Sequence, residues 1–283
     1  MGAADAFPTV HQLLLSVLAL RVRIRWRRQE AFPSLITNFG ALKVPEHDGD
    51  PHLDYRITGA GDVLSVASRR HAPLRARNLA HMLYLVEKSL TVDLQMRRAD
   101  LFFLHAAALE WQGKAHLLVA DPGGGKSTLT WGLLHHGFGY LSDELAPIEI
   151  DHLQVHAYAH ALCLKRQPPV FPLPDATLHL GDTIHVPVAA LPGPVRTAPL
   201  PLAAIFFLQY APHHHRPALR SIKPAEAAAR LYAGALNPLA HPDSGLTPTL
   251  RIAQSVPCFV AATAGLPATC ELISATVAAG TTC

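Results

Sequence analysis

The sequence predicts an α/β fold, in which a small α+β module at residues 1–98 precedes a larger α/β domain at residues 99–283. Hydrophobic residues make up 49% of the 283 positions and charged residues only 16%, which is enough apolar material for a sizeable core. After residue 99, strand-like apolar runs alternate with helix-like runs, as they do in α/β domains. A glycine-rich loop joins one of these strands to one of these helices.

Short alternating stretches predict the strands of the N-terminal module. Between residues 21 and 26, arginines alternate with apolar side chains, so this strand has one apolar face and one cationic face. Two more strands are expected at 53–57 and 63–67, with Gly59, Gly61 and Asp62 forming the turn between them. Apolar residues at helical spacing predict an amphipathic helix over residues 75–96, which closes the module.

The elements of the second domain follow from its apolar runs and from the glycines and prolines between them. We expect strands at 101–110, 115–120, 140–144, 146–150, 202–210 and 256–261, and helices at 127–136 and 224–235. Gly137 is expected to end the first helix, and Pro224 to begin the second. Residues 167–201 are rich in proline, which predicts loop and edge structure.

The loop A-D-P-G-G-G-K-S at residues 120–127 fits the phosphate-binding pattern G-x-x-x-x-G-K-[ST], with Ala120 in place of the first glycine. Consecutive glycines let several backbone N–H groups point inward, and the following helix adds its positive end. Lys126 supplies a charge for the β- and γ-phosphates, and Ser127 a hydroxyl for Mg²⁺. The expected contacts with nucleotide are Asp121, Pro122, Gly123, Gly124, Gly125, Lys126, Ser127 and Thr128. The alternative is a glycine turn that binds nothing.

A phosphate loop also needs an acid near its metal ion, and Asp143 and Glu144 end the strand after the loop helix. One carboxylate can hold Mg²⁺ through water while the other accepts a proton from an attacking hydroxyl. The alternative is one surface acid and one structural acid. His105, in an apolar strand beside the loop strand, is either a core residue or a functional one. Asp121 is either a further acid or a turn-forming residue.

Residues 104–148, LHAAALEWQGKAHLLVADPGGGKSTLTWGLLHHGFGYLSDELAPI, resemble the core of HPr kinase/phosphorylase. They look more similar still to the HPr-kinase-related proteins associated with biosynthesis of ribosomally made peptides, including lasso peptides. The parent family's loop reads GDSGxGKS, and an acidic pair follows its loop helix. Ser142-Asp143-Glu144 takes the place of that pair, and His105 stands where the family has a histidine that assists its catalytic aspartate. The likeness covers roughly residues 75–240 and implies a P-loop HPr kinase-like domain with a mixed central sheet.

The resemblance also implies an activity. It assigns Asp143 as the catalytic base, helped by His105 and Lys126, and Ser127 and Glu144 as ligands of Mg²⁺. ATP is then the donor, and the acceptor is a serine hydroxyl of a peptide or small protein, such as a lasso peptide. It further implies a homo-oligomer.

Three departures from the family predict an acceptor other than HPr. Pro122 replaces a serine of the parent loop, Glu144 replaces an aspartate, and the signature that docks HPr is not found. Two alternatives remain open: a small-molecule kinase, and a nucleotide-binding regulatory module that transfers no phosphoryl group.

Composition excludes several classes of partner. A formal net charge of +3 is far from that of a dedicated nucleic-acid binder. The apolar run at residues 13–20 is too short to cross a bilayer, so no membrane partner is expected. The cysteines form no C-x-x-C pair, and we interpret them as reduced thiols of a cytoplasmic protein.

Three basic or histidine-containing segments have two interpretations each. The arginines at 21, 23, 25, 27 and 28 either bind an acidic peptide or nucleic acid, or are simply solvated. Lys165 and Arg166 either return to the phosphates or are solvated. His213-His214-His215, between two prolines, is either an exposed loop, which we favour, or a metal site.

Overall fold

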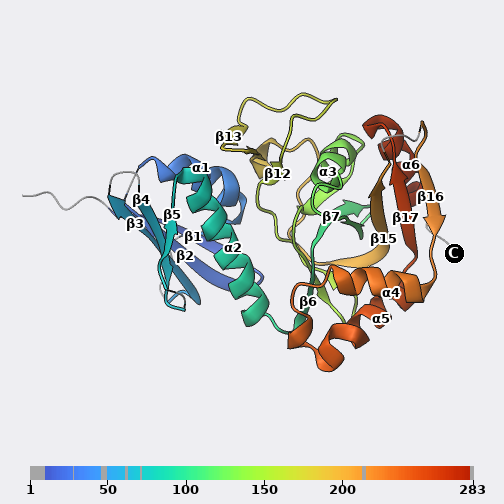
Figure 1. The fold of residues 1–283 in the computed structure, drawn as a ribbon, viewed down its shortest axis with the longest axis horizontal. Helices are drawn as coiled ribbons and strands as arrows, with labels where there is room; N and C mark the ends of the chain where they lie inside the picture. The colour runs from blue at the N-terminus through green and yellow to red at the C-terminus, as the bar shows by residue number, and fades with distance from the viewer. Residues whose placement is uncertain are drawn as a thin grey trace, which may run out of the picture.

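The computed structural model describes residues 10–27, 29–45, 50–60, 63–70, 72–211 and 215–280. These residues form a mixed α/β arrangement in which a five-stranded sheet with two helices lies beside a larger, curled mixed sheet with helices on both faces (Figure 1). The predicted α/β class is therefore confirmed. Among these residues, no helix is both long enough and apolar enough to cross a membrane.

The N-terminal sheet has the strands in chain order. They are β1 (His11–Val17), β2 (Leu20–Trp26), β3 (Leu53–Ala60), β4 (Val63–Ser68) and β5 (Leu74–Ala76). Two helices, α1 (Ala31–Phe39) and α2 (Leu79–Arg97), pack on this sheet and share one apolar cluster with it. The strands expected at 21–26, 53–57 and 63–67 and the helix at 75–96 are confirmed, with shifted ends. Gly59 lies inside β3 rather than in the turn, whose other members, Gly61 and Asp62, lie outside the described residues.

The cationic face of β2 is partly neutralised by its neighbouring strand. Val22, Ile24 and Trp26 are buried, as the alternation predicts. On the other face, Arg23 Nη2 and Arg25 Nη2 each lie 2.8 Å from Asp54 Oδ2 on β3. This pairing favours a structural role for these two arginines. Arg28 lies outside the described residues.

The larger sheet contains nine strands within the described part of the chain, along the path β6-β10-β11-β15-β8-β7-β9, with β17 joined to β15 and β16 joined to β17. The strands are β6 (Leu101–Leu104), β7 (Ala106–Trp111), β8 (Lys114–Val119), β9 (Gly139–Ser142), β10 (Ala146–Glu149), β11 (Gln154–Val155), β15 (Leu200–Tyr210), β16 (Ala218–Ser221) and β17 (Cys258–Thr263). β15 is parallel to β8 and to β17, and the other pairs are antiparallel. The sheet is therefore mixed.

Helices cover the two faces of this sheet (Figure 1). α3 (Lys126–His135) and α6 (Leu266–Ala278) pack on one face, and α4 (Pro224–Ala233) and α5 (Leu246–Ser255) on the other. β15 serves both faces because its side chains alternate: Phe206 packs on the first side and Phe207 on the second. A small three-stranded sheet joins β12 (Leu162–Leu164), just before the proline-rich region, to β14 (Thr183–Val186) and β13 (Leu178–Leu180) within it.

The structure corrects the expected strand at 101–110 in one respect. It is two strands, β6 and β7, interrupted at His105. The His105 N–H donates to the carbonyl of Gly234, at 2.9 Å, instead of to a sheet neighbour. Helices α1, α5 and α6 were not predicted. The Gly137 helix end is confirmed, since Gly137 adopts φ +92° beyond α3.

Trp131 anchors α3 to the proline-rich segment, and its removal should destabilise the protein. The side chain is 1% exposed, and its Nε1 donates to the Phe171 carbonyl at 2.9 Å. Trp131→Ala is expected to lower the free energy of unfolding by about 3–5 kcal/mol, because it leaves a cavity and an unpaired carbonyl. Urea denaturation measures this change. Leu239→Ala, at a side chain that is 87% exposed, is the control and should change it by less than about 0.5 kcal/mol.

Candidate active site

Sheet topology brings three segments that carry predicted site residues to one edge. β8 is antiparallel to β7, and β7 is antiparallel to β9, so β8 and β9 end at the same edge where β7 begins. The register agrees: Ala106 lies opposite Val119, and Ala108 opposite Ser142. The glycine loop follows β8, Asp143 follows β9, and His105 precedes β7. The expected site residues at these positions therefore lie at the same edge of the sheet.

The glycine loop has the conformation that only glycine adopts easily. Gly123 and Gly125 have φ of +84° and +87°, and a Cβ at either would meet no heavy atom within 4 Å. The Gly124 N–H donates to the Asp121 carbonyl at 2.8 Å, which closes the turn. α3 begins directly at Lys126, so the N–H groups of its first turn have no acceptor within the helix. Such N–H groups, directly after a glycine turn, suit an anion.

Lys126 and His105 form a pair at the centre of the site. Lys126 Nζ lies 3.2 Å from His105 Nε2, and the lysine is only 8% exposed. Burial lowers the pKa of Lys126, opposed by the charges of Asp143 and Glu144. Burial, and then the Lys126 charge, lowers the pKa of His105. A neutral His105 accepts a hydrogen bond from the lysine ammonium and holds its direction.

Asp143 is the most unusual group in the site. It is 0% exposed, and neither carboxylate oxygen has a hydrogen-bond partner among the described residues. Burial raises its pKa to about 6, while the Lys126 charge lowers it and the Glu144 charge raises it. The Ser127 hydroxyl and the Cys163 backbone both lie close enough to lower this pKa, although neither meets hydrogen-bond geometry with the carboxylate. A buried acid without partners costs folding free energy, which functional sites commonly tolerate.

The remaining predicted residues surround this centre. Glu144 is exposed, and its charge reaches both Lys126 and Asp143. Ser127 and Thr128 are half-buried at the start of α3, whereas Asp121 and Pro122 are exposed on the loop. Asp143 and Glu144 thus both lie near the loop, with Asp143 buried and Glu144 exposed to solvent.

The segments at Lys165 and at residues 213–215 differ in their relation to the candidate site. Lys165 is exposed, and its charge lowers the pKa of His105, after the larger effects of burial and Lys126. It therefore lies near the site. His213 and His214 fall outside the described residues, and His215 is exposed.

Sequence reasoning missed a second group beside the site. Glu87 on α2 lies close enough to Glu144 for its pKa to be raised to about 8, by burial first and by the Glu144 charge second. Glu144 and Lys126 also affect the pKa of His160, which burial lowers. No local pattern in the sequence marks either residue, because α2 is distant in the chain from the glycine loop.

Comparison with known proteins assigns no function to this group of residues. No protein-family model matches the chain, and no curated protein matches it.

Proposed function

We propose that the protein is an ATP- and Mg²⁺-dependent kinase with an HPr kinase-like P-loop domain. It transfers the γ-phosphoryl group to a serine hydroxyl of a peptide or small protein, with a ribosomally made peptide of the lasso class as the substrate that the sequence resemblance favours. The observation that carries the proposal is Asp143: a fully buried carboxylate without hydrogen-bond partners among the described residues, at the sheet edge that also holds the glycine loop and Lys126.

The residues present fit a nucleotide and a hard cation. The left-handed glycines leave open space for phosphate oxygens beside the N-terminus of α3. Ser127 and Glu144 offer the oxygen ligands that Mg²⁺ prefers. When bound, Mg²⁺ neutralises charge on the phosphate oxygens.

The chain's own residues divide the remaining chemistry between them. Lys126 stabilises the negative charge of the transferring phosphoryl group, and His105 holds the ammonium in place. Asp143 accepts the proton of the attacking hydroxyl, a role suited to a carboxylate whose pKa is about 6.

A transfer assay tests the proposal. The full chain is incubated with Mg²⁺ and γ-labelled ATP, together with serine-containing peptides or with a metabolite extract. Label on a peptide serine that depends on Asp143 supports the proposal. Label on a metabolite alone assigns a small-molecule kinase. Nucleotide binding with no labelled product in either mixture assigns a regulatory module.

The pH dependence of kcat/KM should report Asp143. Only the carboxylate accepts a proton, and its fraction falls as the pH drops through about 6. We therefore expect kcat/KM to be level above this pH and to fall about tenfold per pH unit below it. Steady-state rates measured across this range give the profile. A flat profile down to the usual range of an aspartate would remove the general-base assignment.

A further inference from the structure

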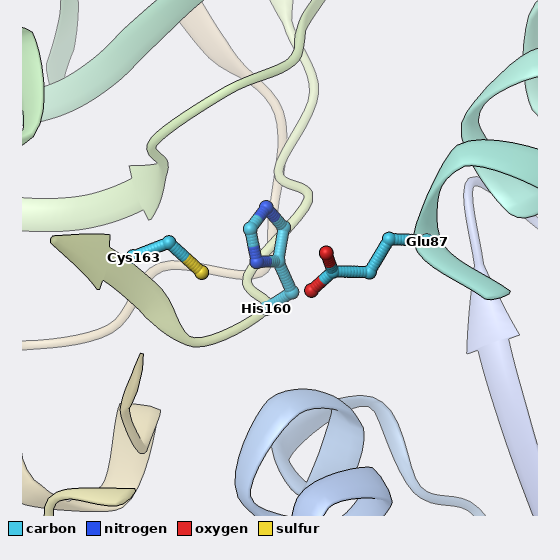
Figure 2. Close-up of side chains that lie close together, drawn as sticks. All are labelled: Glu87, His160 and Cys163. Atoms are coloured by element: carbon cyan, nitrogen blue, oxygen red, sulfur yellow. The ribbon is translucent and has the colours of Figure 1, made fainter. Parts of the chain in front are cut away.

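A second cluster of chemically active side chains lies between α2 and the small three-stranded sheet. It consists of Glu87 on α2, His160 in the segment before β12, and Cys163 on β12 (Figure 2). One ligand atom of each, an oxygen, a nitrogen and the sulfur, lies within 4.8 Å of the other two. None of the three belongs to the phosphate-binding loop, and together they supply sulfur, nitrogen and oxygen donors.

His160 has a ring nitrogen that lacks a hydrogen-bond partner within the described part of the chain, and a bound ion could take that partner's place. It is 3% exposed, and its Nδ1 has no hydrogen-bond partner among the described residues. Figure 2 shows one ring nitrogen turned toward the Cys163 sulfur, with the Glu87 carboxylate on the other side of the ring. An imidazole nitrogen that is buried without a partner costs free energy. A bound cation would give that nitrogen a partner.

Neighbouring side chains form hydrogen bonds with two residues of the cluster. His185 Nδ1 lies 3.3 Å from the Cys163 Sγ and 3.3 Å from the Asn38 Oδ1. The Asn38 side chain in turn donates a hydrogen bond to the Glu87 Oε1. Outer-sphere contacts of this kind orient metal ligands and tune their basicity. Two of the three ligands, Glu87 and Cys163, are thus linked through Asn38 and His185.

We propose that Glu87, His160 and Cys163 bind a divalent transition-metal ion, for which Zn²⁺ is the best chemical match. Zinc accepts thiolate, imidazole and carboxylate together, whereas Mg²⁺ selects oxygen alone. Tetrahedral zinc ligands are separated by about 3.3–3.8 Å, so the side chains would draw together by about 1 Å on binding. Three protein ligands leave a fourth position open to water or another ligand.

This ion would join the two parts of the chain, because Glu87 comes from the N-terminal module and the other two ligands from the larger domain. Burial raises the pKa of Glu87 to about 8 and that of Cys163 well above its usual value. Both groups must lose a proton to the solvent before they bind, so affinity should weaken steeply as the pH falls. The inference does not depend on the proposed kinase activity.

Cobalt(II) provides the test, because a cobalt–thiolate bond has a charge-transfer absorption that cobalt–imidazole binding lacks. The full chain, first treated with a chelator, is titrated with Co²⁺. We expect a stoichiometric band that Zn²⁺ displaces and a higher melting temperature with either ion. Cys163→Ser should remove the band, and the matched control Cys270→Ser, at another buried thiol, should keep it.

A conservative variant protects the test against misfolding. Glu87→Gln keeps the shape of the side chain and its contact with Asn38, so it should fold, as far-UV circular dichroism can check. Its Co²⁺ affinity should be at least about 10-fold weaker. Absence of a thiolate band in the wild type, a band that persists in Cys163→Ser, or unchanged affinity in Glu87→Gln would each overturn the proposal.

Discussion

Asp143→Asn is expected to slow phosphoryl transfer by about 10³-fold, because the amide cannot accept the proton of the attacking hydroxyl. The change keeps the volume of a side chain that is completely buried. Nucleotide affinity should change little, since the glycine loop and Lys126 remain in place. Single-turnover transfer and calorimetric titration with ATP measure the two effects separately.

The same substitution should make the protein more stable. A carboxyl pKa raised from 3.8 to about 6 means that the charged form is disfavoured in the folded state, by at most about 3 kcal/mol. Because the folded pKa is above the unfolded one, this destabilisation is absent below about pH 4 and complete above about pH 6. The neutral asparagine avoids it, so urea denaturation at neutral pH should show a gain. The control Asp182→Asn, at an exposed aspartate, should alter neither the transfer rate nor the free energy of unfolding.

Opposite changes in rate and stability are the signature of a functional residue. Loss of both would make Asp143 a structural acid. An unchanged rate would remove it from the base role.

The elements that the sequence predicted correctly are those with a strong local signal. The strand–loop–helix at β8 and α3 follows from an apolar run, three glycines and a helix that ends at Gly137. The alternation in β2 likewise survives, because a half-buried strand is specified by its own period.

The elements that were missed depend on distant contacts. α6 packs closely on α3, where a Cβ at Gly132 would come within 2.6 Å of the Cys270 Sγ. The interruption at His105 depends on the Gly234 carbonyl, and the Asn237 side chain accepts from the Phe103 N–H beside it. No apolar run carries such information, because the partners come from another part of the chain.

The same distinction applies to the candidate site. Loop residues and acids could be found because a motif places them near one another in sequence. Whether both acids face inward could not be decided until the structure placed Asp143 inside and Glu144 outside. Glu87 could not be found at all, since only the packing of α2 brings it near Glu144.

Lys126→Ala is expected to reduce phosphoryl transfer by about 10³-fold or more and to weaken ATP binding, because the charge that stabilises the phosphoryl oxygens is lost. Calorimetry and single-turnover transfer measure both effects. Lys114→Ala, at an exposed lysine on the neighbouring strand β8, is the matched control and should leave them unchanged. Unchanged affinity and rate in Lys126→Ala would contradict the assignment of the loop itself.

The residual activity of Lys126→Ala also tests whether Lys126 and Asp143 interact electrostatically. The Lys126 charge lowers the pKa of Asp143 against the larger effect of burial. Without that charge, the Asp143 pKa should rise, and the fall in kcat/KM on acidification should begin at a higher pH than in the wild type. A lower rate with no change in the pH at which kcat/KM begins to fall would mean that Lys126 and Asp143 do not interact electrostatically. A lower rate together with the shift would tie the lysine of the loop to the acid after β9, which is the link on which the kinase proposal rests.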